Sequence, residues 1–151
     1  MGKSEEARNL FCNGCNCAQA VFTAFCKETG MDKETALKLS SSFGGGMGRL
    51  REVCGAVSGM FMVAGVLKGY SDVCDTTKKA EHYRLIQEMA KDFENEFGSI
   101  VCRELLNLRK KNDIPQPSER TKEYYKTRSC ADFVAYAAEI AEKKLLSDTV
   151  E

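Results

Sequence analysis

Eight cysteines in a chain of 151 residues are the side chains most able to do chemistry here. Cysteine thiolates are nucleophiles, redox groups and metal ligands. Four of the eight occupy comparable positions: each lies at or near the expected first turn of a helix. These four are Cys17 after Asn16, Cys54 near the start of an apolar segment, Cys102 three residues after Ser99, and Cys130 directly after Ser129.

The first turn of a helix carries unpaired backbone N–H groups and the positive end of the helix dipole, which stabilise a thiolate. We therefore predict lowered pKa values for these four cysteines. Each also lies on the apolar stripe of its helix, with Cys17 close to Val21 and Cys130 close to Phe133. The four side chains should thus point inward and converge. The alternative is that each packs as a small hydrophobic residue, as buried free cysteines commonly do.

The other four cysteines form a less regular set. Cys12 and Cys15 make a Cys-x-x-Cys pair at the entrance of the first main helix. That spacing suits an exchanging dithiol or half of a metal site, and the sequence leaves their role open. A structural zinc site usually has a second pair or closely spaced histidines, whereas His82 is the only histidine. Cys26 and Cys74 have no companion at ligand spacing and are expected to be buried structural residues.

Apolar residues recur at intervals of three and four along the chain, which predicts an all-α, single-domain bundle of about five to seven helices over residues 1–151. The expected helices run from Asn16 to Gly30, from Asp32 toward Phe43, from about Arg51 through the apolar segment 53–67, over 78–97 up to Gly98, from Ser99 past Cys102, and from Ser129 onward, where Ser-Cys-Ala-Asp132 fits a capping box.

A glycine-rich segment, residues 43–49, precedes the central apolar helix. Glycine is too unfavourable in a helix interior for this segment to be helical, so we expect a tight turn that places backbone against Cys54. The segment lacks the lysine and hydroxyl residue of a phosphate-binding loop. Nearby arginines at positions 49, 51 and 103 would favour thiolates at Cys54 or Cys102 if they lie close to them; the alternative is solvated surface arginines. Residues 110–119, with Pro115 and Pro117, are expected to be an exposed loop.

The composition of the chain argues against some classes of binding partner. The 22 basic and 22 acidic residues cancel, which argues against a nucleic acid or an anionic membrane surface. The apolar segment 53–67 is too short to span a bilayer comfortably and contains glycines. Residues 1–10 do not resemble a secretory signal, so we expect a cytoplasmic protein. Because cytoplasmic thiols are normally reduced, catalysis, redox sensing or metal binding explains eight cysteines better than a disulfide framework.

Five ordered motifs carry a family resemblance: residues 16–21, 43–49, 53–59 and 98–106, and Cys130 followed by Phe133 and Val134. They resemble the C_GCAxxG_C_C family of redox-active proteins, named for a Cys-Gly-Ala-x-x-Gly motif and four characteristic cysteines. The resemblance spans nearly the whole chain. It assigns the four family cysteines to Cys17, Cys54, Cys102 and Cys130, and it implies a partner among transporters, near whose genes members are often encoded.

The leading hypothesis is a redox protein that works by thiol–disulfide exchange or redox sensing, in which one thiolate attacks a partner disulfide or an oxidant and a second cysteine resolves the mixed disulfide. The expected partner is a protein thiol or disulfide. We expect Cys54 in the active pair, but four cysteines allow three pairings and spacing does not choose among them. One alternative is an all-cysteine site for zinc, copper(I) or an iron–sulfur cluster formed by Cys17, Cys54, Cys102 and Cys130. Another is a structural module beside a transporter. The sequence leaves open whether the apolar helices form a homo-oligomer.

Overall fold

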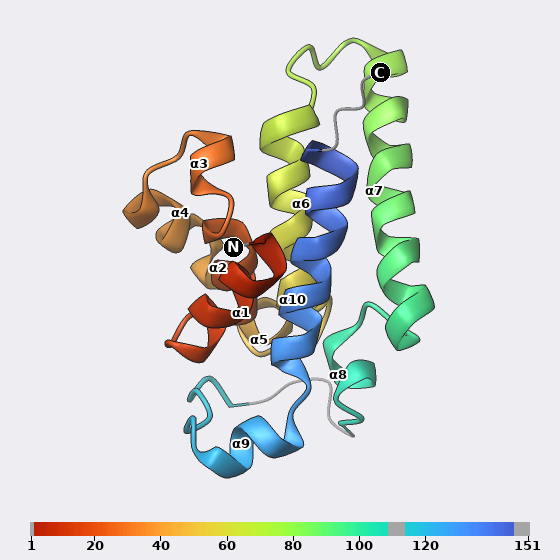
Figure 1. The fold of residues 1–151 in the computed structure, drawn as a ribbon. Helices are drawn as coiled ribbons and strands as arrows, with labels where there is room; N and C mark the ends of the chain where they lie inside the picture. Colours follow the sequence, from red (N-terminus) through yellow and green to blue (C-terminus); the bar gives the residue numbers. More distant parts are fainter. Residues whose placement is uncertain (1, 109–113, 147–151) are drawn as a thin grey trace.

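The computed structural model describes residues 2–108 and 114–146, which form an all-α fold (Figure 1). Within these residues there is no strand, only an isolated antiparallel bridge between Val53 and Val101. The helices are α1 (Lys3–Cys12), α2 (Cys17–Thr23), α3 (Cys26–Thr29), α4 (Lys33–Ser40), the 3₁₀ turn η1 (Ser41–Phe43), α5 (Gly44–Met47), α6 (Gly55–Lys68), α7 (Thr76–Phe97), α8 (Cys102–Leu105), α9 (Lys122–Thr127), α10 (Cys130–Ala141) and the π-helical turn η2 (Glu142–Leu146).

Several predicted helix boundaries are confirmed. The Asn16 side chain accepts a hydrogen bond from the backbone N–H of Gln19, and the Gln19 side chain accepts one from the N–H of Asn16, so α2 begins with a complete capping box. The Asp32 carboxylate caps α4 by accepting a hydrogen bond from the N–H of Thr35. Gly98 ends α7 in the left-handed conformation. The local signals at these three sites are sufficient to set the boundaries.

Other predicted boundaries are wrong. The helix expected from Asn16 to Gly30 is interrupted at Ala24 and Phe25, which separates α2 from α3. The α-helical segments outnumber the five to seven predicted because the first expected helix is divided into α2 and α3, the glycine-rich segment contains the single turn α5, and α1 and α9 were not expected. Helix α1 was not expected at all, although Ala7 and Phe11 on it are fully buried.

The two serine caps also differ from expectation. The residue that immediately precedes α8 is Val101 and not Ser99. The Ser99 hydroxyl accepts a hydrogen bond from the N–H of Val101 and donates one to Glu104. Ser129 does precede α10, but its side chain makes no capping bond. The capping box does not form: the Asp132 N–H donates to the Ser129 carbonyl at 3.0 Å, and the Asp132 carboxylate accepts a hydrogen bond from Arg8 Nη2 at 2.9 Å. This ion pair links α10 to α1, which pack against each other.

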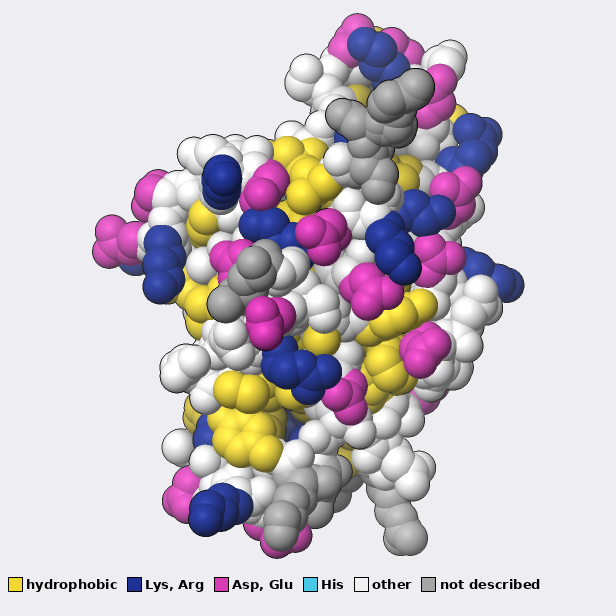
Figure 2. Space-filling model, in the orientation of Figure 1, with side chains coloured by type: hydrophobic (Ala, Val, Ile, Leu, Met, Phe, Trp, Pro, Cys, Tyr) yellow, Lys and Arg dark blue, Asp and Glu magenta, His cyan; other side chains and the backbone are white. Residues whose placement is uncertain are grey.

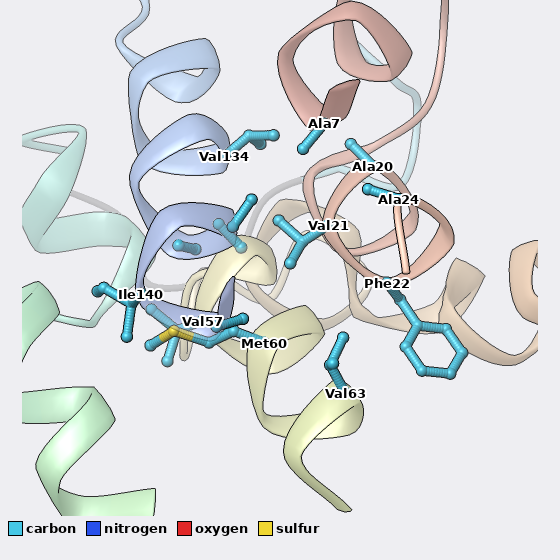
Figure 3. Packing of buried hydrophobic residues seen from close by; sticks show 14 of the residues in the cluster. Ala7, Ala20, Val21, Phe22, Ala24, Val57, Met60, Val63, Val134 and Ile140 are labelled. Carbon is cyan, nitrogen blue, oxygen red and sulfur yellow. The ribbon is translucent and has the colours of Figure 1, made fainter. Parts of the chain in front are cut away.

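The core lies between α2, α6 and α10. In Figure 3, Val21 points from α2 toward Val134 of α10 and Met60 of α6. These three side chains are fully buried, as is Val57. The most apolar segment of the chain is therefore a buried central helix, α6, as predicted.

Close approach of α6 to α2 depends on a small residue at position 59. A Cβ atom on Gly59 would lie 2.9 Å from the carbonyl oxygen of Ala18 and 2.9 Å from Cβ of Val21. Such distances require the backbones to move apart, so glycine at this position allows the two helices to pack.

The helices place several chain segments at one end of the bundle. In Figure 1, α6 and α10 both begin at the lower end, near α5, α8 and α9, and α7 runs in the opposite direction alongside them. Two segments far apart in sequence thus bring their helix starts together. Among the described helices, none combines the length and the apolar character needed to cross a membrane.

The exposure of Cys74 differs from expectation, whereas the predicted loop agrees with expectation in its described residues. Cys74, expected to be buried, is exposed in the connection before α7, where no helix covers it. The predicted loop 110–119 lies partly outside the described residues, at 110–113; residues 114–119 have no helix or strand, and Pro115 and Pro117 are exposed.

Candidate functional site: a cavity lined by four cysteines

A cavity of about 380 Å³ lies at the lower end of the bundle. Among the described residues that line it are Cys17, Cys54, Cys102 and Cys130, which come from four different parts of the chain. Cys17, Cys102 and Cys130 are the first residues of α2, α8 and α10, and Cys54 immediately precedes α6. The prediction that four helix-start cysteines converge is therefore confirmed in position.

Backbone hydrogen bonds hold the segments that carry Cys54 and Cys102 together. The Cys54 N–H donates to the carbonyl of Ile100 at 2.8 Å, and the Cys102 N–H donates to the carbonyl of Glu52 at 2.6 Å. These bonds flank the Val53–Val101 bridge. Main-chain hydrogen bonds thus hold the backbone of Cys54 beside that of the segment that carries Cys102.

The glycine-rich segment forms a left-handed turn at the cavity wall. Five consecutive residues, 45–49, have φ between 62° and 70°, including the non-glycine Met47 and Arg49. A Cβ atom on Gly46 would lie 2.6 Å from Cβ of Cys102, so only glycine lets the turn approach this cysteine. We expected the turn to place backbone against Cys54. It is instead Cys102 that the turn contacts, because the bridge brings residue 102 beside residues 51 and 52.

One of the three arginines expected near the thiols contacts a sulfur. Arg51 is only 3% exposed, and its Nη1 lies 3.6 Å from Sγ of Cys102. Arg49 also lines the cavity, where it donates to the carbonyl of Ile114 and the hydroxyl of Ser118. Arg103 pairs with Glu52 and does not line the cavity. Of these three arginines, Arg51 is therefore the one whose charge lies beside a thiol, that of Cys102.

Cys17 and Cys130 form a hydrogen-bonded thiol pair. The hydrogen bond from Cys17 is the largest of the effects that lower the pKa of Cys130 to about 7. Burial opposes it, whereas the Arg128 charge, a hydrogen bond from Tyr124 and the Arg120 charge act in the same direction. The pKa of Cys17 is raised because its proton is held in this hydrogen bond and because the group is desolvated. The favoured state of the pair is a Cys17 thiol donating to a Cys130 thiolate.

The predicted lowering of all four pKa values is wrong for three of them. Burial raises the pKa of Cys54 to about 12, although the N–H groups of Ala56 and Val57 oppose it. Burial also raises the pKa of Cys102, against the opposing Arg51 guanidinium. Desolvation disfavours a thiolate more than a helix start favours it when the sulfur is enclosed. Only Cys130, which has a thiol donor and cationic neighbours, keeps a lowered pKa.

Sequence reasoning missed a cluster on one side of the cavity: Arg120, Tyr124 and Arg128. The Arg120 guanidinium lies 4.3 Å from the ring centroid of Phe11, and Arg128 lies 5.7 Å from that of Tyr124. Their spacing of four residues is a helical signal, but the segment borders the proline-containing loop. Only the tertiary contact of Arg120 with Phe11 shows that this segment lies beside the cavity cysteines.

The remaining cysteines and the histidine lie elsewhere. Cys12 and Cys74 are exposed, and Cys15 and Cys26 are half-buried against the core. Burial raises the pKa of both Cys15 and Cys26. His82 packs edge-on against Tyr70. None of these five residues is among those that line the cavity.

The fold and the cavity define an all-α protein with four cysteines enclosed at one end of its bundle. The family described as "Putative redox-active protein (C_GCAxxG_C_C)" matches residues 15–144, and the chain belongs to this family. The matched range includes all four cavity cysteines and excludes Cys12. No curated protein and no solved structure matches the chain.

Proposed function

We propose that this family member acts by thiol–disulfide exchange, with Cys130 as the attacking thiolate and Cys17 as the resolving thiol. The observation that carries the proposal is the position of both cysteines in one cavity, at the starts of the packed helices α2 and α10, where the Cys17 thiol favours a thiolate at Cys130. An attacking thiol works best when its pKa is close to the ambient pH. The pKa of Cys130, about 7, meets this condition.

The reaction balances without a further group. The Cys130 thiolate attacks one sulfur of a substrate disulfide and forms a mixed disulfide, and the other substrate sulfur leaves as a thiolate. Cys17, after losing its proton to the leaving group or solvent, then attacks Cys130 Sγ and releases the second substrate thiol. The protein ends as a Cys17–Cys130 disulfide, and the substrate has gained two electrons. An external thiol reductant reverses the protein's oxidation.

The stoichiometry of thiol release tests this assignment. Serine variants at positions 12, 15, 26 and 74 provide a background without cysteines outside the cavity. In that background, reduced protein treated with bis(2-hydroxyethyl) disulfide should release two equivalents of mercaptoethanol. Cys17→Ser should stop at the mixed disulfide after one equivalent, and Cys130→Ser should release none. Undiminished release by Cys130→Ser would overturn the assignment.

The same series tests the sequence-based expectation that Cys54 belongs to the active pair, which stays a prediction. Cys54→Ser should keep release at two equivalents if Cys17 and Cys130 form the pair. The reaction would be assigned to Cys54 if Cys54→Ser released one equivalent of mercaptoethanol or none while Cys17→Ser still released two.

The alternative of an all-thiolate metal site has less support from the geometry. In residues 2–108 and 114–146, no three side chains of His, Cys, Asp or Glu are placed to hold one metal ion. The cavity cysteines therefore do not fit such a site as they stand. Native mass spectrometry of protein purified anaerobically without chelator tests this point. Stoichiometric zinc, copper or iron that is lost in Cys54→Ser or Cys102→Ser would replace the exchange proposal with metal binding.

A further inference from the structure

The cavity differs in charge from the rest of the molecule. Four arginines line it, and no aspartate or glutamate is among its described lining residues. The whole chain has equal numbers of basic and acidic residues. On the outer face shown in Figure 2, side chains of both signs are interspersed. Positive charge is thus concentrated at the cysteines, in a chain of zero net charge.

Arg120 contributes a positive charge that its own contacts do not neutralise. Its guanidinium donates to the carbonyls of Phe11 and Cys15 at 3.0 Å and to the Tyr125 hydroxyl at 3.3 Å, all neutral acceptors. It is also stacked against the Phe11 ring. These contacts fix the guanidinium at the cavity wall and leave its charge available to a ligand.

Arg128 brings a second charge to the reactive sulfur. It lies over the Tyr124 ring, and Tyr124 in turn donates a hydrogen bond to the Cys130 sulfur. Its backbone immediately precedes Ser129 and the start of α10. An anionic group on a substrate held near Cys130 would therefore meet the Arg128 and Arg120 charges.

The size of the cavity limits what can reach Cys130. Its volume of about 380 Å³ is at the lower end of the range for small-molecule sites. Cys130 is only 7% exposed, so the disulfide of a folded protein has no direct access to it. Pro115 and Pro117 line the cavity and are also exposed, so the cavity reaches the surface at this loop. Leu105, Leu106 and Phe133 give it apolar walls.

We propose that the substrate of this site is a small anionic disulfide, whose acidic groups are held by Arg120 and Arg128 while Cys130 attacks the sulfur–sulfur bond. This inference rests on the exchange reaction proposed above and names its substrate class. Cys130 takes one half of the substrate as a mixed disulfide, and the other half leaves as an anionic thiol. Cys17 then displaces the first half, so that two anionic thiols are released per protein disulfide formed.

Two disulfides of similar size test the charge preference: dithiodiglycolate, which carries two carboxylates, and neutral bis(2-hydroxyethyl) disulfide. Loss of free Cys130 is followed in the tryptic peptide of residues 129–143, or of residues 127–143 in Arg128→Gln, where trypsin no longer cleaves after position 128; neither peptide contains another cysteine. The ratio of the two rates in the folded protein is divided by the same ratio in protein unfolded in concentrated urea. This division removes the intrinsic reactivity of the two reagents.

We expect the folded protein to favour the dianionic disulfide by about tenfold or more, since a cavity of one charge sign concentrates counter-charged ligands to that extent. Added salt should reduce the preference. Arg128→Gln should reduce it strongly, Arg128→Lys should retain most of it, and Arg84→Gln on the exposed face of α7 should leave it unchanged. The ratio is insensitive to the thiolate fraction of Cys130, because both reagents require the thiolate.

A folded-to-unfolded ratio of one, or the same ratio in Arg128→Gln and in the unsubstituted protein, would overturn the anionic substrate class. If both disulfides oxidise Cys130 and the folded-to-unfolded ratio is one, the exchange reaction stands and only the charge preference fails. If neither disulfide consumes Cys130 in the folded protein, both proposals fail. Loss of the preference in high salt, with Arg128→Lys still active, would support the electrostatic origin independently of any misfolding in Arg128→Gln.

Discussion

Removing the hydrogen-bond donor at position 17 should change the acidity of Cys130. The Cys17 thiol is the largest cause of the lowered pKa of Cys130. Cys17→Ala deletes this donor, whereas Cys17→Ser replaces it with a hydroxyl that can donate in its place. The two variants differ by one oxygen atom and form a matched pair.

The expected shift follows from the strength of such a bond. A hydrogen bond to a charged group contributes about 1.5–3 kcal/mol, and about 1.4 kcal/mol corresponds to one pKa unit. Cys17→Ala should therefore raise the pKa of Cys130 by about one to two units, from about 7. Cys17→Ser should leave it close to 7.

The assay is the pH dependence of iodoacetamide labelling. The reagent is neutral, so the arginines do not bias it, and the peptide of residues 129–143 reports Cys130 alone. At pH 7 the labelling rate of Cys17→Ala should fall only about two- to sixfold, because a more basic thiolate is also more nucleophilic. The midpoint of the profile is therefore the better measure. Far-ultraviolet circular dichroism verifies that both variants keep their helices.

The unsubstituted protein and Cys17→Ser should give profiles that rise through about pH 7 and then level off. A Cys17→Ala profile that superimposes on them would refute the role of Cys17 as donor. A rate that keeps rising beyond pH 9 in the unsubstituted protein would show that Cys130 is an ordinary thiol.

Three further predictions use the same structure. Gly59→Ala should destabilise the protein by about 1–3 kcal/mol, because the added Cβ forces α2 away from α6. Gly65→Ala lies on the same helix, but its Cβ would have no atom within 4 Å, so this variant should stabilise the protein by about 0.5–1 kcal/mol. Urea denaturation measures both free energies of unfolding, and equal effects would contradict the role of Gly59 in packing. Cys54, with its pKa near 12, should remain unlabelled by iodoacetamide at pH 8 in folded protein and react once unfolded; fast labelling of the peptide of residues 52–68 in the folded state would contradict its burial. Asp132→Asn should lower stability by no more than about 1 kcal/mol, because its ion pair with Arg8 is exposed; a larger loss in urea denaturation would show that Asp132 has a further role.

Parts of the site could be predicted from the sequence because local signals determine them. Asn16 and Gln19 specify the start of α2, and therefore the position of Cys17, within a few residues. Apolar spacing then places Cys17 and Cys130 on buried stripes. Expected helix starts and apolar stripes together selected the four cysteines that line the cavity.

The acidity of the thiols could not be predicted in this way. A helix start lowers a thiol pKa only if the sulfur keeps solvent or a donor, and the enclosure of Cys54 depends on the packing of the surrounding helices. The pairing of Cys17 with Cys130 depends on how α2 and α10 cross. The contact of Arg120 with Phe11 joins residues far apart in sequence. None of these contacts leaves a local pattern in the sequence.

The central claim is that Cys17 and Cys130 form the reversible dithiol, and a non-reducing peptide map tests it most directly. Protein with serine at positions 12, 15, 26 and 74 is equilibrated with glutathione redox buffers, trapped with acid and alkylated. The claim predicts one disulfide, between the peptide of residues 9–27 and that of residues 129–143, which disappears on return to reducing buffer. A reversible disulfide that joins Cys54 to Cys102, with Cys17 and Cys130 both alkylated, would contradict it.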